Sequence, residues 1–394
     1  MTITEAVFWG SLFLIAYGYF LYALVLGLGC FATRAAREIR GRGGSGRSLA
    51  KAWPPADELP PVSLIFPAYN EEAHLEEKIA NTRQLDYPAD KLEVLIVSDG
   101  STDRTNEILK AAPDPNFRTI FLPQRGGKFN ALNRAVSEAR HDIFLFCDAT
   151  TLFPPGIVRL LVRHFADPRI GVAAGALQFQ GTAEYHGTQG IYWKFEALLR
   201  RMEGRLGLTI TASGANYALR RVCYRFLTAN DAVEDCLIPM HARGMGYKVV
   251  YDPEAVGSEL AASSVRNEFG RKVRFAVGGF GSLPSLLGAA ARSSPKIAFA
   301  FLSHKLLRWI APFFFAALLA SNAALLEHPF YRCTFIAQLL FYFWAGAGFI
   351  FRERMKTVRF ALIGYFVVAM NIALAVGFFR FLAGREEAIW QRAE

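Results

Sequence analysis

Apolar residues are concentrated in four long blocks along the chain. Residues 7–32 carry no charged side chain, and neither do residues 309–326, 333–351 and 360–379. A helix rises about 1.5 Å per residue and a bilayer's hydrocarbon core is about 30 Å thick, so each block is near the length that a spanning helix needs. The pattern predicts a transmembrane helix over 1–33 and three transmembrane segments over 298–382.

A cleavable signal peptide is the alternative explanation of the first block. Such a peptide has an apolar core of about 7–15 residues behind a basic start. The block at 7–32 is longer, follows Glu5, and has its arginines on the other side. These features favour a retained membrane anchor.

Between the first and second blocks, short apolar stretches alternate with stretches of helical spacing. Four of them are rich in β-branched or aromatic residues and are typical of strands: 62–69, 92–100, 118–123 and 142–149. Further strands are expected at 170–180 and 248–255, and an amphipathic helix at 191–206. The alternation predicts an α/β fold with a mostly parallel sheet and helices on both faces. Ligands bind at the carboxyl ends of such strands.

The net charge of +10 is concentrated beside the apolar blocks. Basic residues fill 34–61, a linker by its glycine and proline content, and the short loop at 352–359. The positive-inside rule places both on the cytoplasmic side, so the N-terminus is expected outside and the central region inside. Anionic lipid explains these charges better than nucleic acid.

The remaining segments complete the expected layout. Residues 261–297 are basic, amphipathic and rich in glycine and serine, which predicts interfacial helices. The tail at 383–394 lies outside if all three late segments cross, and a re-entrant loop is the alternative for the last one. The five cysteines and seven histidines show neither disulfide nor metal-ligand spacing.

Six motifs stand in a characteristic order: PAYNEE (67–72), SDGSTD (98–103), GGKFNALN (126–133), CDATT (147–151), ASGANYALRR (212–221) and VEDCLIPMHARGMGYKVVYDPEA (233–255). Their order and spacing resemble family-2 glycosyltransferases of the GT-A fold. These are membrane enzymes similar to cellulose, chitin and hyaluronan synthases. The resemblance covers about 62–276 and implies a GT-A domain over 62–260.

The first three motifs are candidates for binding the sugar nucleotide. Backbone groups of Pro67, Ala68 and Tyr69 and the carboxylate of Glu71 lie between a strand and a helix, where a base and ribose can bind; a simple helix start is the alternative. By resemblance, Asp99 accepts the uracil imide N–H. Lys128 follows two glycines at a helix start, a place suited to a diphosphate, although a solvated lysine is the alternative.

Asp148 is the candidate metal ligand. A departing diphosphate needs its charge neutralised, and Mg²⁺ or Mn²⁺ bound by carboxylate and phosphate oxygens does this. The family pattern Asp-x-Asp is broken here, because Thr150 occupies the second position. One carboxylate is still compatible with a site, since Mg²⁺ commonly uses only one or two and completes its shell with phosphates and waters.

By resemblance, Asp235 is the general base that deprotonates the acceptor. The neighbouring Glu234 is the alternative, and Asp231 is a lesser candidate. Two acids at a helix start are also commonly found as favourable partners of the helix dipole.

The stretch RKVRF corresponds to the Gln-x-x-Arg-Trp motif of processive synthases. Arg274 keeps the arginine that would contact the diphosphate, whereas Arg271 replaces the glutamine and Phe275 the tryptophan. Phenylalanine can stack on a sugar but has no N–H donor. The departure weakens the case for processive synthesis.

These expectations describe a multi-pass protein of the plasma (inner) membrane with a cytoplasmic catalytic domain. It transfers sugar from a UDP-sugar to a growing exopolysaccharide or a lipid-linked saccharide, with membrane lipids and synthase or export proteins as partners. A non-processive glycolipid transferase acting on a polyprenyl- or ceramide-type lipid is one alternative. The other is a catalytically silent sugar-nucleotide-binding subunit of a synthase complex.

Overall fold

The computed structural model describes residues 1–39, 58–180, 188–228, 231, 233–260, 265–351 and 362–384. Most of the predicted basic linker, the basic loop at 352–359 and most of the C-terminal tail lie outside these ranges. The first residues of the predicted interfacial segment, 261–264, also lie outside.

The centre of the molecule is a seven-stranded sheet with the order β3-β2-β1-β4-β6-β5-β7. Its strands are β1 Val62–Ala68, β2 Leu92–Asp99, β3 Phe117–Leu122, β4 Ile143–Cys147, β5 Ile170–Gln180, β6 Asn216–Arg220 and β7 Lys248–Leu260. Strands β3, β2, β1 and β4 are parallel, β5 and β7 are parallel, and β6 alone runs antiparallel to its neighbours. The predicted mostly parallel sheet is confirmed.

Successive residues of β1 face opposite sides of the sheet, as the pleat requires. Leu64 and Phe66 pack under α3 Leu75–Arg83, α4 Thr105–Lys110 and α6 Ile157–Val162. Ile65 instead packs in the cluster that contains α5 Lys128–Glu138 and α8 Glu234–Gly244. Helices therefore cover both faces, and the carboxyl ends of β1, β2 and β4 meet at one edge.

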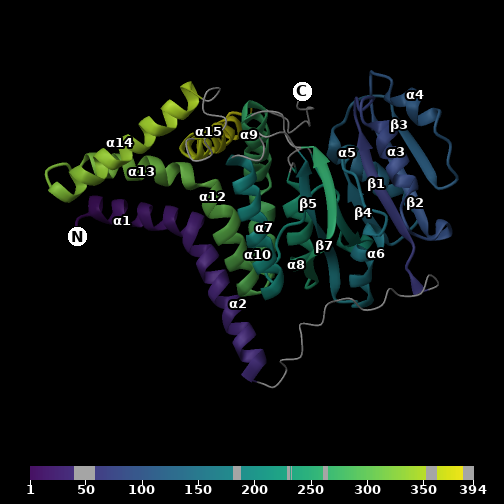
Figure 1. The fold of residues 1–394 in the computed structure, drawn as a ribbon, viewed down its shortest axis with the longest axis horizontal. Coiled ribbons are helices and arrows are strands. Elements are labelled where there is room, and N and C mark those ends of the chain that lie inside the picture. Colours follow the sequence, from purple (N-terminus) through teal and green to yellow (C-terminus); the bar gives the residue numbers. More distant parts are fainter. Residues whose placement is uncertain are drawn as a thin grey trace.

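The apolar helices gather on the other side of the molecule (Figure 1). They are α1 Ile3–Ala16, the π-helical turn η1 Tyr17–Leu21, α2 Tyr22–Ile39, α11 Pro295–Phe301, the π-helical turn η6 Leu302–Leu306, α12 Leu307–Trp309, α13 Ala311–Ala323, α14 Pro329–Ile350 and α15 Ile363–Leu382. Three stretches within the described ranges are long and apolar enough to cross a membrane, at 3–36, 329–350 and 363–382. The block predicted at 309–326 differs from a simple span. It belongs to a helix pair, 295–309 and 311–323, bent by 61°.

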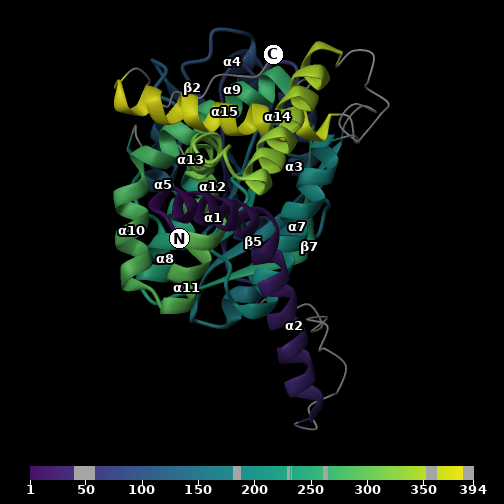
Figure 2. The ribbon, with the colours of Figure 1, turned by 90° about the vertical axis from the view of Figure 1, so that its left-hand side faces the viewer.

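Three helices connect the sheet to the apolar side: α7 Thr188–Leu206, α9 Val265–Gly281 and α10 Leu283–Arg292. Helix α15 lies across α9 in both views (Figures 1 and 2). The two helices approach closely at Gly377, where an added Cβ would lie 2.5 Å from Ala276 Cβ and 2.7 Å from the Val273 carbonyl oxygen. Glycine is therefore required at this crossing.

A buried polar cluster joins α7 to the apolar helices. His304 places Nδ1 2.7 Å from Glu203 Oε1 and Nε2 3.2 Å from Glu196 Oε2. The Tyr22 hydroxyl also donates to Glu203, at 2.8 Å, and Arg308 pairs with Glu196. The cluster therefore joins α2, η6 and α12 to α7 through polar and charged side chains that are shielded from solvent.

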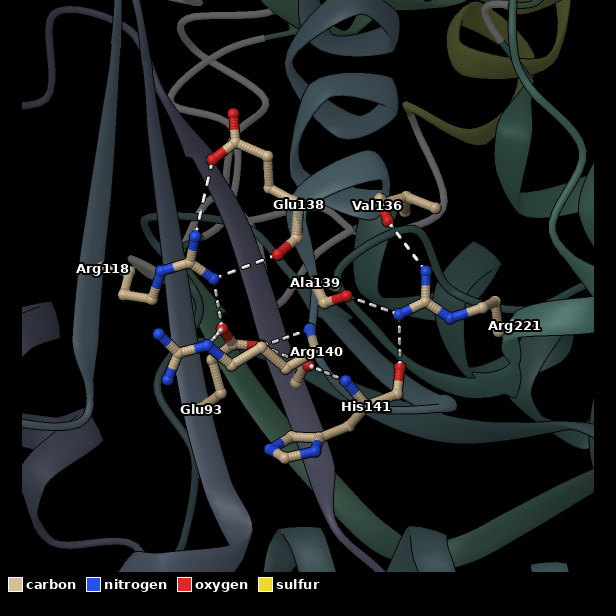
Figure 3. A network of polar contacts seen from close by, with 9 residues as sticks. Glu93, Arg118, Val136, Glu138, Ala139, Arg140, His141 and Arg221 are labelled. Atoms are coloured by element: carbon tan, nitrogen blue, oxygen red, sulfur yellow. Dashed lines mark hydrogen bonds and ion pairs between the residues drawn. The ribbon is translucent and has the colours of Figure 1, made fainter.

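The edge of the sheet opposite the strand carboxyl ends is closed by a second polar network (Figure 3). Glu93 is 5% exposed, and its carboxylate accepts from the Ser63 hydroxyl at 2.6 Å, Arg118 Nη1 at 2.6 Å and the Arg140 N–H at 2.9 Å. Burial alone would raise the pKa of Glu93, but these hydrogen bonds outweigh it and lower the pKa below its usual value. Arg118 also donates to the Glu138 carbonyl at 3.0 Å.

The same network fixes the end of α5. The Arg221 guanidinium donates to three carbonyl oxygens at 2.5–3.2 Å, those of Val136, Ala139 and His141. The last turn of α5 is thereby attached to the sheet. Because α5 begins at Lys128, this anchoring also limits movement at its first residue.

Candidate active site

The loops that follow β1 and β2 form one hydrogen-bonded unit. Asn70 adopts a positive φ of 54°, which asparagine tolerates better than most residues. Its N–H donates to the Ser101 hydroxyl at 3.2 Å, and its side-chain oxygen accepts the Thr102 N–H at 2.8 Å. The Glu71 N–H donates to the Thr105 hydroxyl at 2.8 Å. Two predicted motifs are therefore held side by side.

The end of β2 supports the turn that precedes Lys128. Asp99 is 3% exposed, and its two carboxylate oxygens accept the N–H groups of Gly126 and Gly127 at 2.8 and 2.7 Å. Gly100 has a φ of 65°, and a Cβ there would lie 2.5 Å from the Arg125 backbone nitrogen. Asp99 is thus a positioning residue in this structure, and its contact with uracil stays a prediction.

The predicted nucleoside residues lie at the end of β1 and just beyond it. Ala68 is the last residue of β1 and is buried, as is Glu71, whereas Pro67 and Tyr69 are half-buried. The guanidinium of Arg125 lies 4.0 Å from the centre of the Tyr69 ring. Arg125 was not predicted, although a cation directly before a glycine pair and a lysine was a usable signal.

Lys128 lies between two carboxylates from different elements. Its Nζ is 2.7 Å from Asp148 Oδ1 at the end of β4 and 2.9 Å from Glu234 Oε1 at the start of α8. Burial alone would lower the pKa of Lys128, but the two carboxylates outweigh it and hold the pKa above its usual value. The structure therefore brings together residues from three separate motifs.

Side chains of helix α3 hold the loop after Asp148. The Thr151 N–H donates to the Asp148 carbonyl at 3.1 Å, which closes a turn. Lys78 is 1% exposed and donates to the Thr151 carbonyl at 2.5 Å. Asn81 exchanges two hydrogen bonds of 2.8 Å with the backbone of Phe153. These contacts fix the loop that carries Asp148 and Thr150.

Glu259 is an acid at the site that was not predicted from the sequence. Strand β7 continues past the predicted end at 255, and a bridge between Leu152 and Ser258 ties it to the loop after β4 through two 2.8 Å hydrogen bonds. The Thr150 hydroxyl donates to Glu259 Oε1 at 3.4 Å. Burial, together with the nearby charge of Asp148, raises the pKa of Glu259 to about 7.

The two acids at the start of α8 differ in their partners. Glu234 pairs with Lys128, whereas the carboxylate of Asp235 makes no hydrogen bond or ion pair with any residue that the structure describes. Burial raises the pKa of Glu234, and Asp235 and Asp148 add to this effect while Lys128 opposes it. Gly214 leaves space beside the pair, because a Cβ there would lie 3.4 Å from Glu234 Oε1 and 3.7 Å from Lys128 Nζ.

Asp231, the lesser candidate for the base, is a structural residue. It is 4% exposed, and its carboxylate accepts from the N–H and the hydroxyl of Thr228, both at 2.8 Å. Ser282 donates to its other oxygen at 3.3 Å.

Arg271 lies at the site from the side of α9. Its guanidinium donates to Glu268 at 2.9 and 2.8 Å and lies 5.5 Å from the Trp193 ring on α7. The attraction between Arg271 and Glu259 also contributes to the electrostatics of both groups. The first basic residue of RKVRF is therefore close to the strand ends.

Phe275 packs against side chains from two helices, α9 and α12. Its ring meets Trp309 edge-on at 5.7 Å between ring centres, and Lys272 Nζ lies 5.2 Å from its centre. Arg274 is half-buried on α9. The predicted contacts of Phe275 with a sugar and of Arg274 with a diphosphate stay predictions.

Comparison with known proteins identifies the domain that carries these residues. Residues 63–226 match the family model described as glycosyl transferase family 2. This part of the chain is a family-2 glycosyltransferase domain. The matched range contains Asp99, Lys128 and Asp148 and ends before Asp235.

Curated relatives match the glycosyltransferase domain at modest identity. Poly-beta-1,6-N-acetyl-D-glucosamine synthase of Staphylococcus aureus (strain COL) is 26% identical over 230 residues, which cover 57% of this chain and 55% of the relative. The enzyme of the same name from Staphylococcus epidermidis is 24% identical over 225 residues, 55% of this chain and 54% of the relative. The chain spans about half the length of the curated relatives it matches.

A solved structure shares the fold over almost the whole chain. The mannosyltransferase PcManGT from Pyrobaculum calidifontis, in complex with GDP-Man and Mn²⁺, superimposes with a TM-score of 0.62 at 23% identity. The match covers 95% of this chain and 100% of that one. The likeness confirms the GT-A fold expected from the motifs.

Proposed function

We propose that this chain is a membrane-embedded, inverting glycosyltransferase that uses a UDP-sugar. The observation that carries the proposal is the carboxylate of Asp235, which makes no hydrogen bond or ion pair with the described residues and lies beside the paired Lys128, Asp148 and Glu234. One acid is free to accept a proton, and the neighbouring cation can stabilise a diphosphate. The family-2 domain and the polysaccharide synthases among its relatives support a sugar transfer.

Asp235 acts as the general base. It takes the proton of the acceptor hydroxyl while that oxygen forms a bond to the anomeric carbon of the donor. The bond between this carbon and the diphosphate breaks, and the diphosphate leaves with the electron pair. A single displacement inverts the anomeric configuration. General-base catalysis typically contributes about 10²–10⁴-fold to the rate. Glu234 holds Lys128 in place and is not free for this role.

Lys128 and Arg274 bind the departing diphosphate. Asp148 and Thr150 offer carboxylate and hydroxyl oxygens, the hard donors that suit Mg²⁺ or Mn²⁺. Bound there, the divalent cation would neutralise the charge that develops on the diphosphate. Within the described ranges no three His, Cys, Asp or Glu side chains form a preformed metal site, so phosphate oxygens and waters would complete the shell.

The end of β1 and the Asp99 turn bind the nucleoside. Backbone groups of Pro67 and Ala68, the Tyr69 ring and the Glu71 carboxylate surround the base and ribose, and the second lone pairs of the Asp99 oxygens accept the uracil imide N–H. PcManGT was solved with GDP-Man, so the nucleotide requires a direct test. Competition between UDP and GDP for the purified chain decides between the two bases.

The acceptor is a growing exopolysaccharide or a lipid-linked saccharide at the bilayer. The glycosyltransferase domain faces the cytoplasm of a plasma membrane that the chain crosses several times, and export of a polymer would require partner proteins. A polyprenyl- or ceramide-type lipid acceptor is the second possibility, because RKVRF departs from the processive pattern at Arg271 and Phe275. Product length on a gel separates a polymer from a single addition.

The variant Asp235→Asn tests the proposal. In the purified chain, sugar transfer should fall by at least about 100-fold, while UDP binding measured by calorimetry stays unchanged. Asp86→Asn, at a carboxylate whose side chain is 63% exposed, is the matched control and should transfer normally. Near-normal transfer by Asp235→Asn would remove Asp235 from the reaction.

The same assays address the silent-subunit alternative. A wild-type chain that binds UDP but neither hydrolyses nor transfers any nucleotide sugar would overturn the proposed catalysis and favour a regulatory subunit.

A further inference from the structure

Thr150 occupies the position where the family pattern places a second acid, yet a carboxylate from another strand lies next to its side chain. Glu259, more than one hundred residues later in the chain, accepts the Thr150 hydroxyl at 3.4 Å. Thr150 is the second residue after Asp148, and Glu259 is the second to last residue of β7.

The backbone fixes Glu259 in this position. Ser258 and Leu152 exchange two hydrogen bonds of 2.8 Å. A Cβ at Gly257 would lie 2.9 Å from the Phe153 ring and 3.3 Å from Thr151 Cγ2, so only glycine allows β7 to approach this closely. The end of β7 and the loop after β4 are therefore held together independently of any ligand.

The charges around Glu259 leave it available to a cation. Asp148 repels it, while its nearest cations have other partners: Arg271 donates twice to Glu268, and Lys128 is shared by Asp148 and Glu234. In the described part of the chain Glu259 makes no ion pair within 4 Å, and its hydrogen bond with Thr150 is long. A divalent cation between two such carboxylates would relieve their repulsion.

We propose that Glu259 supplies the second carboxylate ligand of the divalent cation, in place of the acid that is missing at position 150. Thr150 orients the Glu259 carboxylate through its hydroxyl. This inference rests on the proposed use of a divalent cation by the glycosyltransferase. Together, Asp148 and Glu259 provide the one or two carboxylates that Mg²⁺ or Mn²⁺ commonly takes from a protein. The second acid of the pattern is thus contributed by a distant strand.

Mn²⁺ binding to the full-length chain tests this assignment without requiring activity. It is measured in the presence of UDP from the electron paramagnetic resonance signal of free Mn²⁺. Glu259→Gln should weaken Mn²⁺ binding by about 10-fold or more. The matched control is Glu254→Gln on the same strand. Glu254 is 55% exposed and pairs with Arg163 at 2.7 Å away from the site, so this variant should bind Mn²⁺ as the wild type does.

A compensating variant gives a second, independent readout. If Glu259 replaces the missing acid, Thr150→Asp introduced into Glu259→Gln should recover most of the lost Mn²⁺ affinity. Glu259→Asp keeps the charge but withdraws the carboxylate by one methylene, and it should weaken binding even if Glu259→Gln fails to fold. Unchanged Mn²⁺ affinity in either folded Glu259 variant would overturn the assignment.

The outcome can be separated from that of the proposed function. If Glu259→Gln weakens Mn²⁺ binding but the wild type transfers no sugar, the catalytic proposal is overturned and the ligand assignment stands. Normal sugar transfer by a wild type whose Mn²⁺ affinity does not depend on Glu259 would do the opposite.

Discussion

The Asp99 carboxylate accepts the backbone N–H of Gly127 at 2.7 Å, so strand β2 holds the turn that delivers Lys128 to the site. Strand β4 delivers Asp148 and helix α8 delivers Glu234 to the same ammonium group. The site is therefore assembled by three elements that meet at one edge of the sheet.

Replacing Asp99 by Asn should disrupt this turn. The two Asp99 oxygens each accept one backbone N–H, from Gly126 and Gly127. An Asn side chain has only one acceptor oxygen, and its NH₂ group would face the other backbone N–H. Buried hydrogen bonds to a charged group contribute about 1.5–3 kcal/mol each, so we expect a lower Tm and UDP binding weakened by at least about 10-fold. Asp142→Asn, at a carboxylate that is 93% exposed, is the control. Unchanged UDP affinity in Asp99→Asn would contradict the positioning role.

Replacing Lys128 by Met should leave Asp148 and Glu234 facing each other without a counter-charge. Removing one partner of a buried pair costs about 3–5 kcal/mol, although partial exposure reduces the cost here. We expect a lower Tm and a raised KM for the donor. Adding Glu234→Gln to Lys128→Met should recover part of the Tm, because one of the uncompensated charges is removed. The absence of any recovery would argue against the pairing.

Gly214 should be sensitive to side-chain size. A methyl group at Gly214→Ala meets Glu234 at an ordinary contact distance of 3.4 Å, so this variant should fold and keep most of its transfer activity. The larger Gly214→Val should keep its Tm but lose transfer by about 10-fold or more, because its branches enter the space beside Lys128. Gly10→Ala, with no atom within 4 Å of the added Cβ, serves as the control. Full activity of Gly214→Val would show that this space is not used.

Glu93 should contribute stability that depends on pH. Its pKa is lowered in the folded state, so its contribution is complete above the unfolded value of about 4.3. The contribution is lost as the pH falls through the folded pKa. Glu93→Gln should therefore lower the Tm at pH 7, by the equivalent of about 2–3 kcal/mol, and the gap to the wild type should narrow as the pH falls below about 4.

The control for this prediction is Glu107→Gln, which removes a carboxylate that is 77% exposed and paired with Arg104. It should change the Tm little at either pH. A Tm gap for Glu93→Gln that does not narrow between pH 7 and a pH well below 4 would refute the electrostatic explanation.

His304 should be essential to the joint between α7 and the apolar helices. His304→Ala removes the partner of two buried carboxylates, Glu196 and Glu203, and we expect a loss of about 3 kcal/mol or more in stability. Fluorescence-detected Tm in detergent measures it. Adding Glu203→Gln should lessen the loss. Equal Tm values for His304→Ala and the wild type would mean that His304 is not needed to hold the joint.

The strands of the core were predictable because their signal is local. Ile65 and Phe66 lie on opposite faces, and the runs that contain β1, β2 and β4 are mostly apolar, as expected for strands buried on both sides. Strand β6 was missed, since its five residues are too few to show a clear alternation of apolar and polar positions. The bend near Ile310 was also missed, because it falls at the start of the apolar block predicted at 309–326.

The partners of the site residues were less predictable than their identities. The motifs pointed to Lys128, Asp148 and Glu234 separately, but no local pattern shows that one ammonium contacts both carboxylates. Glu259 was overlooked because the strand was predicted to end at 255, and its neighbour Thr150 is distant in sequence. Such pairings follow from strand order and register, which a single sequence does not specify.

The close crossing of α15 on α9 has a mechanical consequence. At Gly377 the backbones meet without room for a side chain, so the two helices tilt or shift as one rigid body. Helices that span a bilayer adjust their tilt when its thickness changes. Since α9 carries Arg271 and Arg274, a shift of α15 would move these two guanidinium groups relative to the strand ends.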